Sequence, residues 1–138
     1  MPKASQIILI YLIALISFLA IDLVWLGLIA RDWYNSKIGF LLARQTNWTA
    51  ALIFYAMFIA GLLYFAFLPG MESGSIGQIL LRSALYGFIT YSTYDLTNLA
   101  TLEGWPVIFS LVDITWGTIL CTSVSAITYW LSNLFNLI

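Results

Sequence analysis

Four long apolar segments restrict the fold of this 138-residue chain more than any other feature of its sequence. Each segment holds close to the roughly 20 residues that an α-helix needs to cross the hydrocarbon core of a bilayer. A charged residue, a proline or a tryptophan lies at or near an end of each segment. We therefore expect an all-α polytopic membrane protein, an antiparallel bundle of four transmembrane helices in a single domain. The predicted helices cover residues 6–30, 48–68, 79–102 and 107–131.

The composition supports this assignment and limits the classes of partner. Hydrophobic residues make up 62% of the chain and charged residues only 8%, whereas soluble domains contain roughly 25% charged residues. The apolar surface must therefore face lipid, which is the first expected partner. A net charge of −1 gives no reason to expect a nucleic-acid partner. A second copy of the chain is the other candidate partner.

The chain lacks the residues that several kinds of catalysis and cofactor binding require. The chain has no histidine, which is the commonest general base and the commonest ligand of transition metals. Its single cysteine, Cys121, lies inside an apolar segment, so no disulfide can form within the chain. No nucleotide-binding loop, haem ligand or nucleophile with an adjacent base is recognisable, and no motif indicates a cofactor.

Three acidic residues, Asp22, Asp95 and Asp113, lie within the apolar segments. A charged side chain at the centre of a membrane helix costs at least about 2.5–3.5 kcal/mol, so such residues are candidates for function by default. Each lies seven to nine residues from the same predicted membrane face, because alternate helices cross in opposite directions. At 1.5 Å per residue this places all three roughly 10–13 Å deep. Three helices thus bring a carboxyl group to one level.

Aromatic and amide side chains accompany these acids. Trp25, Asn98 and Trp116 each follow an aspartate by three residues, a spacing that puts both side chains on one helix face. Glycines at Gly27 and Gly117 come next in the first and fourth helices, and we expect each to permit a close helix contact. Together with a tyrosine from the second helix and one beside the third-helix acid, the predicted ligand-binding residues are Asp22, Asp95, Asp113, Asn98, Trp25, Trp116, Tyr55 and Tyr94.

Two further patterns concern the polar parts of the chain. In the longest connection, residues 31–47, Tyr34 and Ile38 begin a helical spacing that predicts a short helix at the membrane surface. The third apolar segment is rich in hydroxyl groups, among them Thr90 and Thr93. These groups line a cavity or form hydrogen bonds between helices.

The acids have two interpretations. Each could accept hydrogen bonds from a neighbouring helix and simply hold the bundle together. Alternatively, the three could meet in a binding site, where like charges in a low dielectric cannot all stay ionised, so one acid carries a proton or a cation lies among them. A metal ion, if one binds, would take Asp22, Asp95 and Asp113 as ligands.

Blocks of sequence around these acids resemble one known family. The resemblance is carried by residues Asp22–Gly27, Tyr55, Thr93–Leu102, Trp105 and Asp113–Gly117. In these residues the chain resembles the DUF2177 family of bacterial inner-membrane proteins, whose function is unknown. The resemblance covers nearly the whole chain. It implies four transmembrane helices, the bacterial cytoplasmic membrane and an association with lipid metabolism. It implies no specific activity.

Three functional hypotheses follow. The first is a protein that binds or transports a proton, a metal ion or a small cationic or lipid-like ligand through the Asp cluster. The second is a lipid-modifying membrane enzyme that uses Asp95 and Asp113 as an acid–base pair or holds Mg²⁺ through oxygen ligands. The third is an accessory subunit of a lipid-metabolism complex, in which the acids serve assembly.

Overall fold

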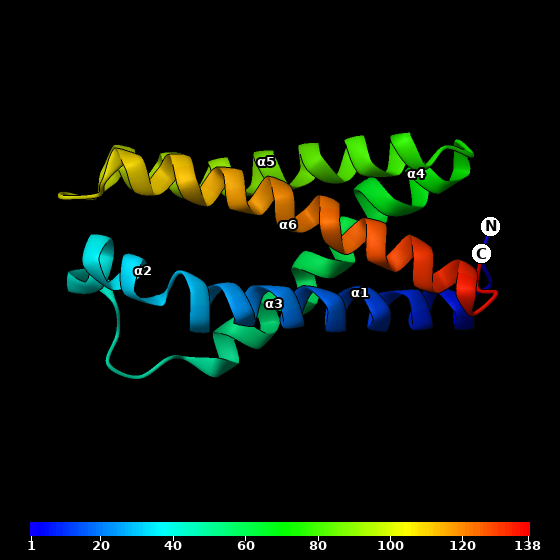
Figure 1. Cartoon of the computed structure of the whole chain (residues 1–138), viewed down its shortest axis with the longest axis horizontal. Coiled ribbons are helices and arrows are strands. Elements are labelled where there is room, and N and C mark those ends of the chain that lie inside the picture. Colours follow the sequence, from blue (N-terminus) through cyan, green and yellow to red (C-terminus); the bar gives the residue numbers. More distant parts are fainter.

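The computed structural model describes all residues from 1 to 138, and every regular element in it is a helix (Figure 1). This confirms the expected all-α fold, and the predicted helices agree with the observed ones to within about one helical turn at each end. The elements in chain order are α1 (Ala4–Val24), the π-helical η1 (Trp25–Ile29), α2 (Arg31–Ile38), the 3-10 turn η2 (Gly39–Leu41), α3 (Trp48–Leu62), the π-helical η3 (Leu63–Phe67), α4 (Leu68–Glu72), α5 (Ile76–Thr101) and α6 (Val107–Leu134).

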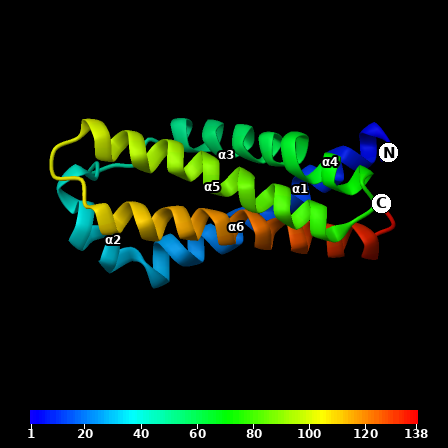
Figure 2. The same ribbon diagram turned by 90° about the horizontal axis from the view of Figure 1, so that it is seen from above.

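Helices α1, α5 and α6 run lengthwise through the molecule, α3 is inclined to them, and both chain termini lie at the same end (Figure 1). Helices α5 and α6 lie side by side in opposite directions, and α1 packs against α6 (Figure 2). Helix α3 crosses α1 and continues through η3 and α4, which pack against α5. Helix α2 lies at the end opposite the termini (Figure 1).

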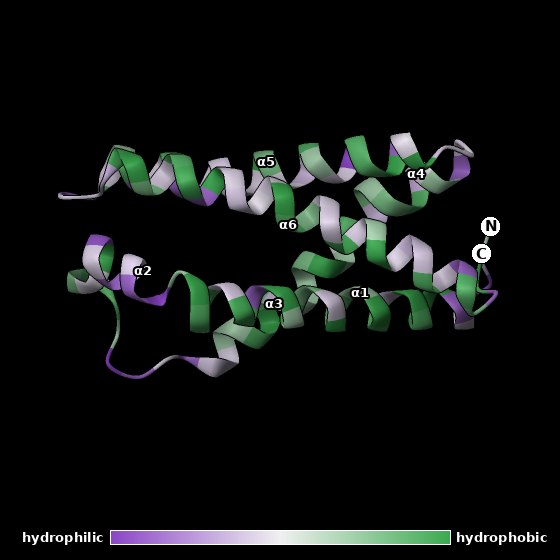
Figure 3. Cartoon of the chain, in the orientation of Figure 1, coloured by the Kyte–Doolittle hydropathy of each residue, from purple (hydrophilic) through white to green (hydrophobic).

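Three helical stretches are long and apolar enough to cross a membrane: Ala4–Ile29, Trp48–Glu72 and Val107–Leu134. Most of the surface of these helices is apolar, and polar residues gather in α2, in the connections and at the termini (Figure 3). Apolar side chains such as those of Leu28 and Met57 point outward and are 79% and 69% exposed. The chain is therefore a multi-pass membrane protein.

Helix α5 is about as long as these three stretches but is less apolar, because it carries Gln78, Arg82 and Asn98 besides its hydroxyl groups. The Thr90 hydroxyl donates a hydrogen bond to the carbonyl oxygen of Tyr86 at 2.7 Å, and that of Thr93 to Ile89 at 2.7 Å. Of the two alternatives for these threonines, hydrogen bonds to other helices are not formed, because both hydroxyls bond the backbone of their own helix. A hydroxyl satisfied in this way can face an apolar environment at little cost.

We predict that α5 is the fourth transmembrane helix. Four crossings place the N-terminus and the C-terminus on the same side of the membrane, as their common position in the structure requires, whereas three crossings place them on opposite sides. Labelling of single cysteines at Ser5 and Asn136 in intact cells or vesicles, in a Cys121→Ser background, should show the same accessibility for both. Labelling of the two positions from opposite sides would exclude a fourth crossing.

The second apolar segment was expected to end as a helix at residue 68, just before Pro69. In the structure, the helix continues past this proline. The chain turns through the π-helical segment η3 and continues as α4 to Glu72. Pro69 lies in the first turn of α4, where a missing backbone N–H is tolerated. The wider turn of a π-helix changes the hydrogen-bond partners just before the proline, so the helix bends and continues instead of ending.

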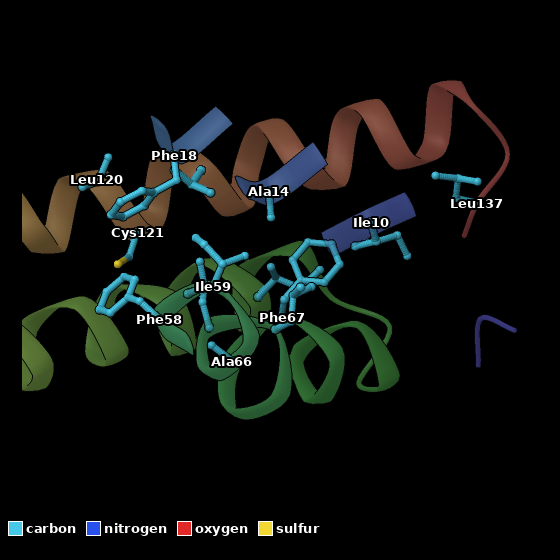
Figure 4. Close-up of a cluster of buried hydrophobic side chains, with 14 residues drawn as sticks. Ile10, Ala14, Phe18, Phe58, Ile59, Ala66, Phe67, Leu120, Cys121 and Leu137 are labelled. Carbon is cyan, nitrogen blue, oxygen red and sulfur yellow. The ribbon is translucent and has the colours of Figure 1, made fainter. Parts of the chain in front are cut away.

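A buried apolar cluster joins α1, α3, η3 and α6 (Figure 4). Phe18 of α1 packs its ring 5.4 Å from that of Phe58 in α3. Cys121 of α6 is fully buried in this cluster, which agrees with a packing role and not with a reactive thiol. The cluster holds the middle of the bundle together and leaves the polar site nearer to the α2 end.

The contact between α5 and α6 depends on two glycines. A Cβ atom added at Gly87 would meet the backbone carbonyl oxygen of Gly117, and one added at Gly117 would meet the ring of Tyr91. Gly117 thus permits the expected close contact. Gly27 does not, because nothing lies within 4 Å of the position of its missing Cβ. That part of the prediction was wrong, since Gly27 lies in the π-helical turn and points away from other helices.

Candidate functional site

A cavity of about 700 Å³ lies between the α2 end of α1 and helices α3, α5 and α6. Its wall is mainly aromatic, with two carboxyl groups and two threonine hydroxyls, and it contains no Lys or Arg. The cavity is lined by Asp22, Leu26, Tyr34, Ile38, Leu42, Phe54, Tyr55, Phe58, Thr90, Tyr91, Thr93, Tyr94, Phe109, Asp113 and Trp116.

The two carboxyl groups in the wall are each held by a donor from a different helix. The indole Nε1 of Trp116 in α6 donates to Oδ1 of Asp22 in α1 at 3.3 Å. The hydroxyl of Tyr34 in α2 donates to Oδ1 of Asp113 in α6 at 2.7 Å. Each acid therefore ties one helix to another and lines the cavity.

The two tryptophans of the predicted site form a stack. The rings of Trp25 and Trp116 lie 4.3 Å apart with an angle of 11° between their planes. Trp25 also donates from Nε1 to the hydroxyl of Tyr34 at 3.3 Å. Because Trp25 begins the π-helical turn η1, its ring is directed towards α6 and α2. The structure thus brings the two predicted tryptophans together, but only Trp116 lines the cavity.

Of the two residues that donate hydrogen bonds to the cavity acids, Tyr34 is the one that the sequence did not assign to the site. The predicted surface helix exists, as α2, but one face of it packs onto the bundle. The ring of Trp33 stacks on Phe109 at 5.5 Å, and Ile38 is buried beside Trp105. The spacing of Tyr34 and Ile38 was the available signal, but it was consistent with burial in lipid headgroups as well as in protein.

The hydroxyl of Tyr34 remains a proton donor over the whole physiological range. Burial and the nearby carboxylate of Asp113 both raise the pKa of Tyr34 above its ordinary value. A neutral phenol can donate its single proton to Asp113 while its oxygen accepts from Trp25. The chain from Trp25 through Tyr34 to Asp113 therefore has one fixed direction.

Asp95 lies behind the cavity and does not line it. Its side chain is fully buried and its carboxyl group lies beside that of Asp113. Neither carboxyl oxygen of Asp95 has a hydrogen-bond partner. The nearby Ser110 hydroxyl instead donates to the backbone carbonyl oxygen of Asp95 at 3.3 Å, and itself accepts from Trp105 at 2.9 Å.

The other predicted residues divide into two groups. Tyr55 and Tyr94 line the cavity, whereas Asn98 does not. The conditional metal site of Asp22, Asp95 and Asp113 has no counterpart in the structure. No group of three or more His, Cys, Asp or Glu side chains is arranged to hold a metal ion, because Asp95 faces the α5–α6 contact while Asp22 is engaged by Trp116.

Comparison with known protein families finds one family model that matches most of the chain. The model of the DUF2177 family, described as a predicted membrane protein, matches residues 7–130. The chain belongs to the DUF2177 family. The match includes Asp22, Asp95 and Asp113, and it ends within α6. No curated protein and no solved structure matches the chain significantly. The function of this DUF2177 protein must therefore be argued from its own site.

Proposed function

We propose that this DUF2177 protein binds an organic cation with an apolar body in the cavity between α1, α2, α3, α5 and α6. The observation that carries the proposal is a pair of carboxyl groups, Asp22 and Asp113, in an aromatic cavity without a basic side chain. Buried carboxylates in a low dielectric require a compensating positive charge or a proton. The protein supplies no Lys or Arg here, so a ligand can supply the charge.

The size and wall of the cavity favour an organic ligand over an inorganic ion. A volume of about 700 Å³ falls within the range of pockets that hold small organic molecules. The faces of Tyr55, Tyr91 and Trp116 can attract a cation that has shed its water. Small inorganic cations instead prefer a close shell of oxygen ligands, which the separated acids do not form.

The position of the cavity supports a ligand that reaches it through the lipid. Phe54 of α3 and Tyr94 of α5 both line the cavity and are 48% and 54% exposed. The cavity wall is therefore continuous with the surface that contacts lipid. Following the family resemblance, we place this protein in the cytoplasmic membrane of a bacterium. A lipophilic cation dissolved in that bilayer could enter the cavity from the side of the bundle.

Binding of tetraphenylphosphonium to the purified protein tests the proposal. The protein is placed in nanodiscs of uncharged phosphatidylcholine, and binding is followed by equilibrium dialysis and by quenching of tryptophan fluorescence. The double variant Asp22→Asn/Asp113→Asn should bind at least about tenfold more weakly, because a charge pair at about 4 Å contributes about 1–4 kcal/mol. The matched control Asp32→Asn changes an exposed acid of α2 outside the cavity and should bind like the wild type.

The hydrogen bonds from Trp116 to Asp22 and from Tyr34 to Asp113 favour a second candidate function, in which the acids only join helices. Assembly of this kind predicts a double variant that unfolds more readily and a wild type that binds no cation. A stable double variant with weakened binding supports the ligand site. Equal binding by the wild type, the double variant and the control would exclude it.

A further inference from the structure

A carboxyl group that no protein donor satisfies lies directly behind the cavity. Asp95 is fully buried, both of its carboxyl oxygens lack a hydrogen-bond partner, and it lies beside Asp113. No Lys or Arg lies in the cavity wall. The titratable groups around the carboxyl pair and the cavity are Asp22 from α1, Tyr34 from α2, Tyr55 from α3, Tyr91 and Tyr94 from α5, and Asp113 from α6.

An ionised Asp95 in this position would lack both a counter-charge and a hydrogen bond, which is among the most unfavourable states of a buried group. A proton on Asp95 removes the charge and supplies a donor that Asp113 can accept. The buried and unpartnered position of Asp95 therefore favours one proton on this carboxyl group, donated to Asp113, when no cation is bound.

We infer that binding of an organic cation in the cavity displaces this proton, so that the site exchanges one cation for one proton. This inference rests on the proposed function. Asp113 is the link, because it lines the cavity on one side and meets Asp95 on the other. A positive charge beside Asp113 stabilises the ionised form of both acids.

The exchange is a proton transfer without any change of electrons. The O–H bond of the shared proton breaks, and the proton passes by way of Asp113 to a water or buffer base that enters the cavity. One positive charge enters the site as one leaves, so the net charge of the buried region is unchanged. Such an exchange allows a proton gradient across the membrane to drive the release of the ligand, as linkage requires.

The experiment adds tetraphenylphosphonium to the wild-type protein in weakly buffered nanodiscs that contain a pH indicator. We expect about one proton to be released per cation bound. The dissociation constant for tetraphenylphosphonium should fall about tenfold for each unit that the pH rises, over the range in which the cation-free site holds the proton. The Asp95→Asn variant should bind without releasing a proton, and its dissociation constant should not vary with pH. The control Asp32→Asn should release the proton as the wild type does.

Infrared spectroscopy of the protein without any cation gives an independent readout. A carboxylic acid C=O band should be present in the wild type and in Asp32→Asn, and absent from Asp95→Asn. If tetraphenylphosphonium does not bind to the wild type, the proposed function fails, while the band still shows whether the pair holds a proton. Binding to the wild type without proton release, whether or not the band is present, overturns the inference and leaves the proposed function intact. Both measurements on the wild type remain decisive if Asp95→Asn does not fold.

Discussion

Replacement of Gly87 by alanine is expected to destabilise the bundle strongly. The new Cβ would meet the backbone carbonyl oxygen of Gly117 and, at 3.0 Å, the side chain of Cys121. A backbone oxygen cannot turn aside as a side chain can, so α5 and α6 must separate. Overpacking of this kind typically costs about 1–3 kcal/mol, and we expect a value at the upper end.

The matched control for this prediction is Gly27→Ala, which adds the same methyl group where nothing lies within 4 Å. Alanine has the higher helix propensity, by about 1 kcal/mol, so this variant should be as stable as the wild type or slightly more stable. Unfolding by increasing mole fraction of dodecyl sulfate in mixed micelles, followed by circular dichroism, measures both. Equal stability of the two variants would contradict the close packing of α5 on α6.

Replacement of Tyr34 by phenylalanine is expected to release α2 from the bundle. The change removes the hydrogen bond to Asp113 at 2.7 Å and leaves Trp25 without its acceptor, while the ring contact with Phe109 can remain. A hydrogen bond to an ionised acceptor contributes about 1.5–3 kcal/mol. Local opening of α2 should therefore become about 10–100-fold more frequent.

Limited trypsin digestion reports this opening, because Lys37 and Arg44 lie at the end of α2 and in the following connection. The Tyr34→Phe variant should be cut there much faster than the wild type, with no change in the total helix content. The control Tyr64→Phe alters a tyrosine that is 71% exposed and should be cut at the rate of the wild type. Equal rates for the two variants would mean that Tyr34 does not hold α2 in place.

Tyr34 also shows why the sequence predicted only part of the site. The sequence pointed to Asp22 and Asp113, which line the cavity, because a carboxyl group inside an apolar segment is costly enough to indicate a function by itself. Trp116 and Tyr55 were named by their spacing and depth relative to these acids, and they also line the cavity. A tyrosine in an amphipathic connection carries no such signal. Its contact with Asp113 is 79 residues away along the chain, and helix spacing gives no information about which distant residue α2 covers.

The rotation of each helix about its own axis was the second quantity that the sequence left open. The equal depths predicted for the three acids agree with the position of Asp22 and Asp113 on one cavity. Depth does not determine towards which neighbouring helix a side chain points. Asp95 faces the α5–α6 contact instead, because Gly87 and Gly117 bring those two helices together along that face. The same reasoning explains Asn98, which follows Asp95 by three residues and does not reach the cavity.

The sequence by itself therefore determined the solvent, the elements and the costly groups. Apolar length requires helices in a membrane, since a helix satisfies its own backbone in lipid, and each aspartate requires a hydrogen-bond donor, a cation or a proton. Only the tertiary structure decided which partners those are: a tyrosine from α2 for Asp113, a tryptophan from α6 for Asp22, and none for Asp95. The physical reason is that hydropathy and periodicity act within one helix, whereas the pairing of buried polar groups depends on how small residues let different helices approach.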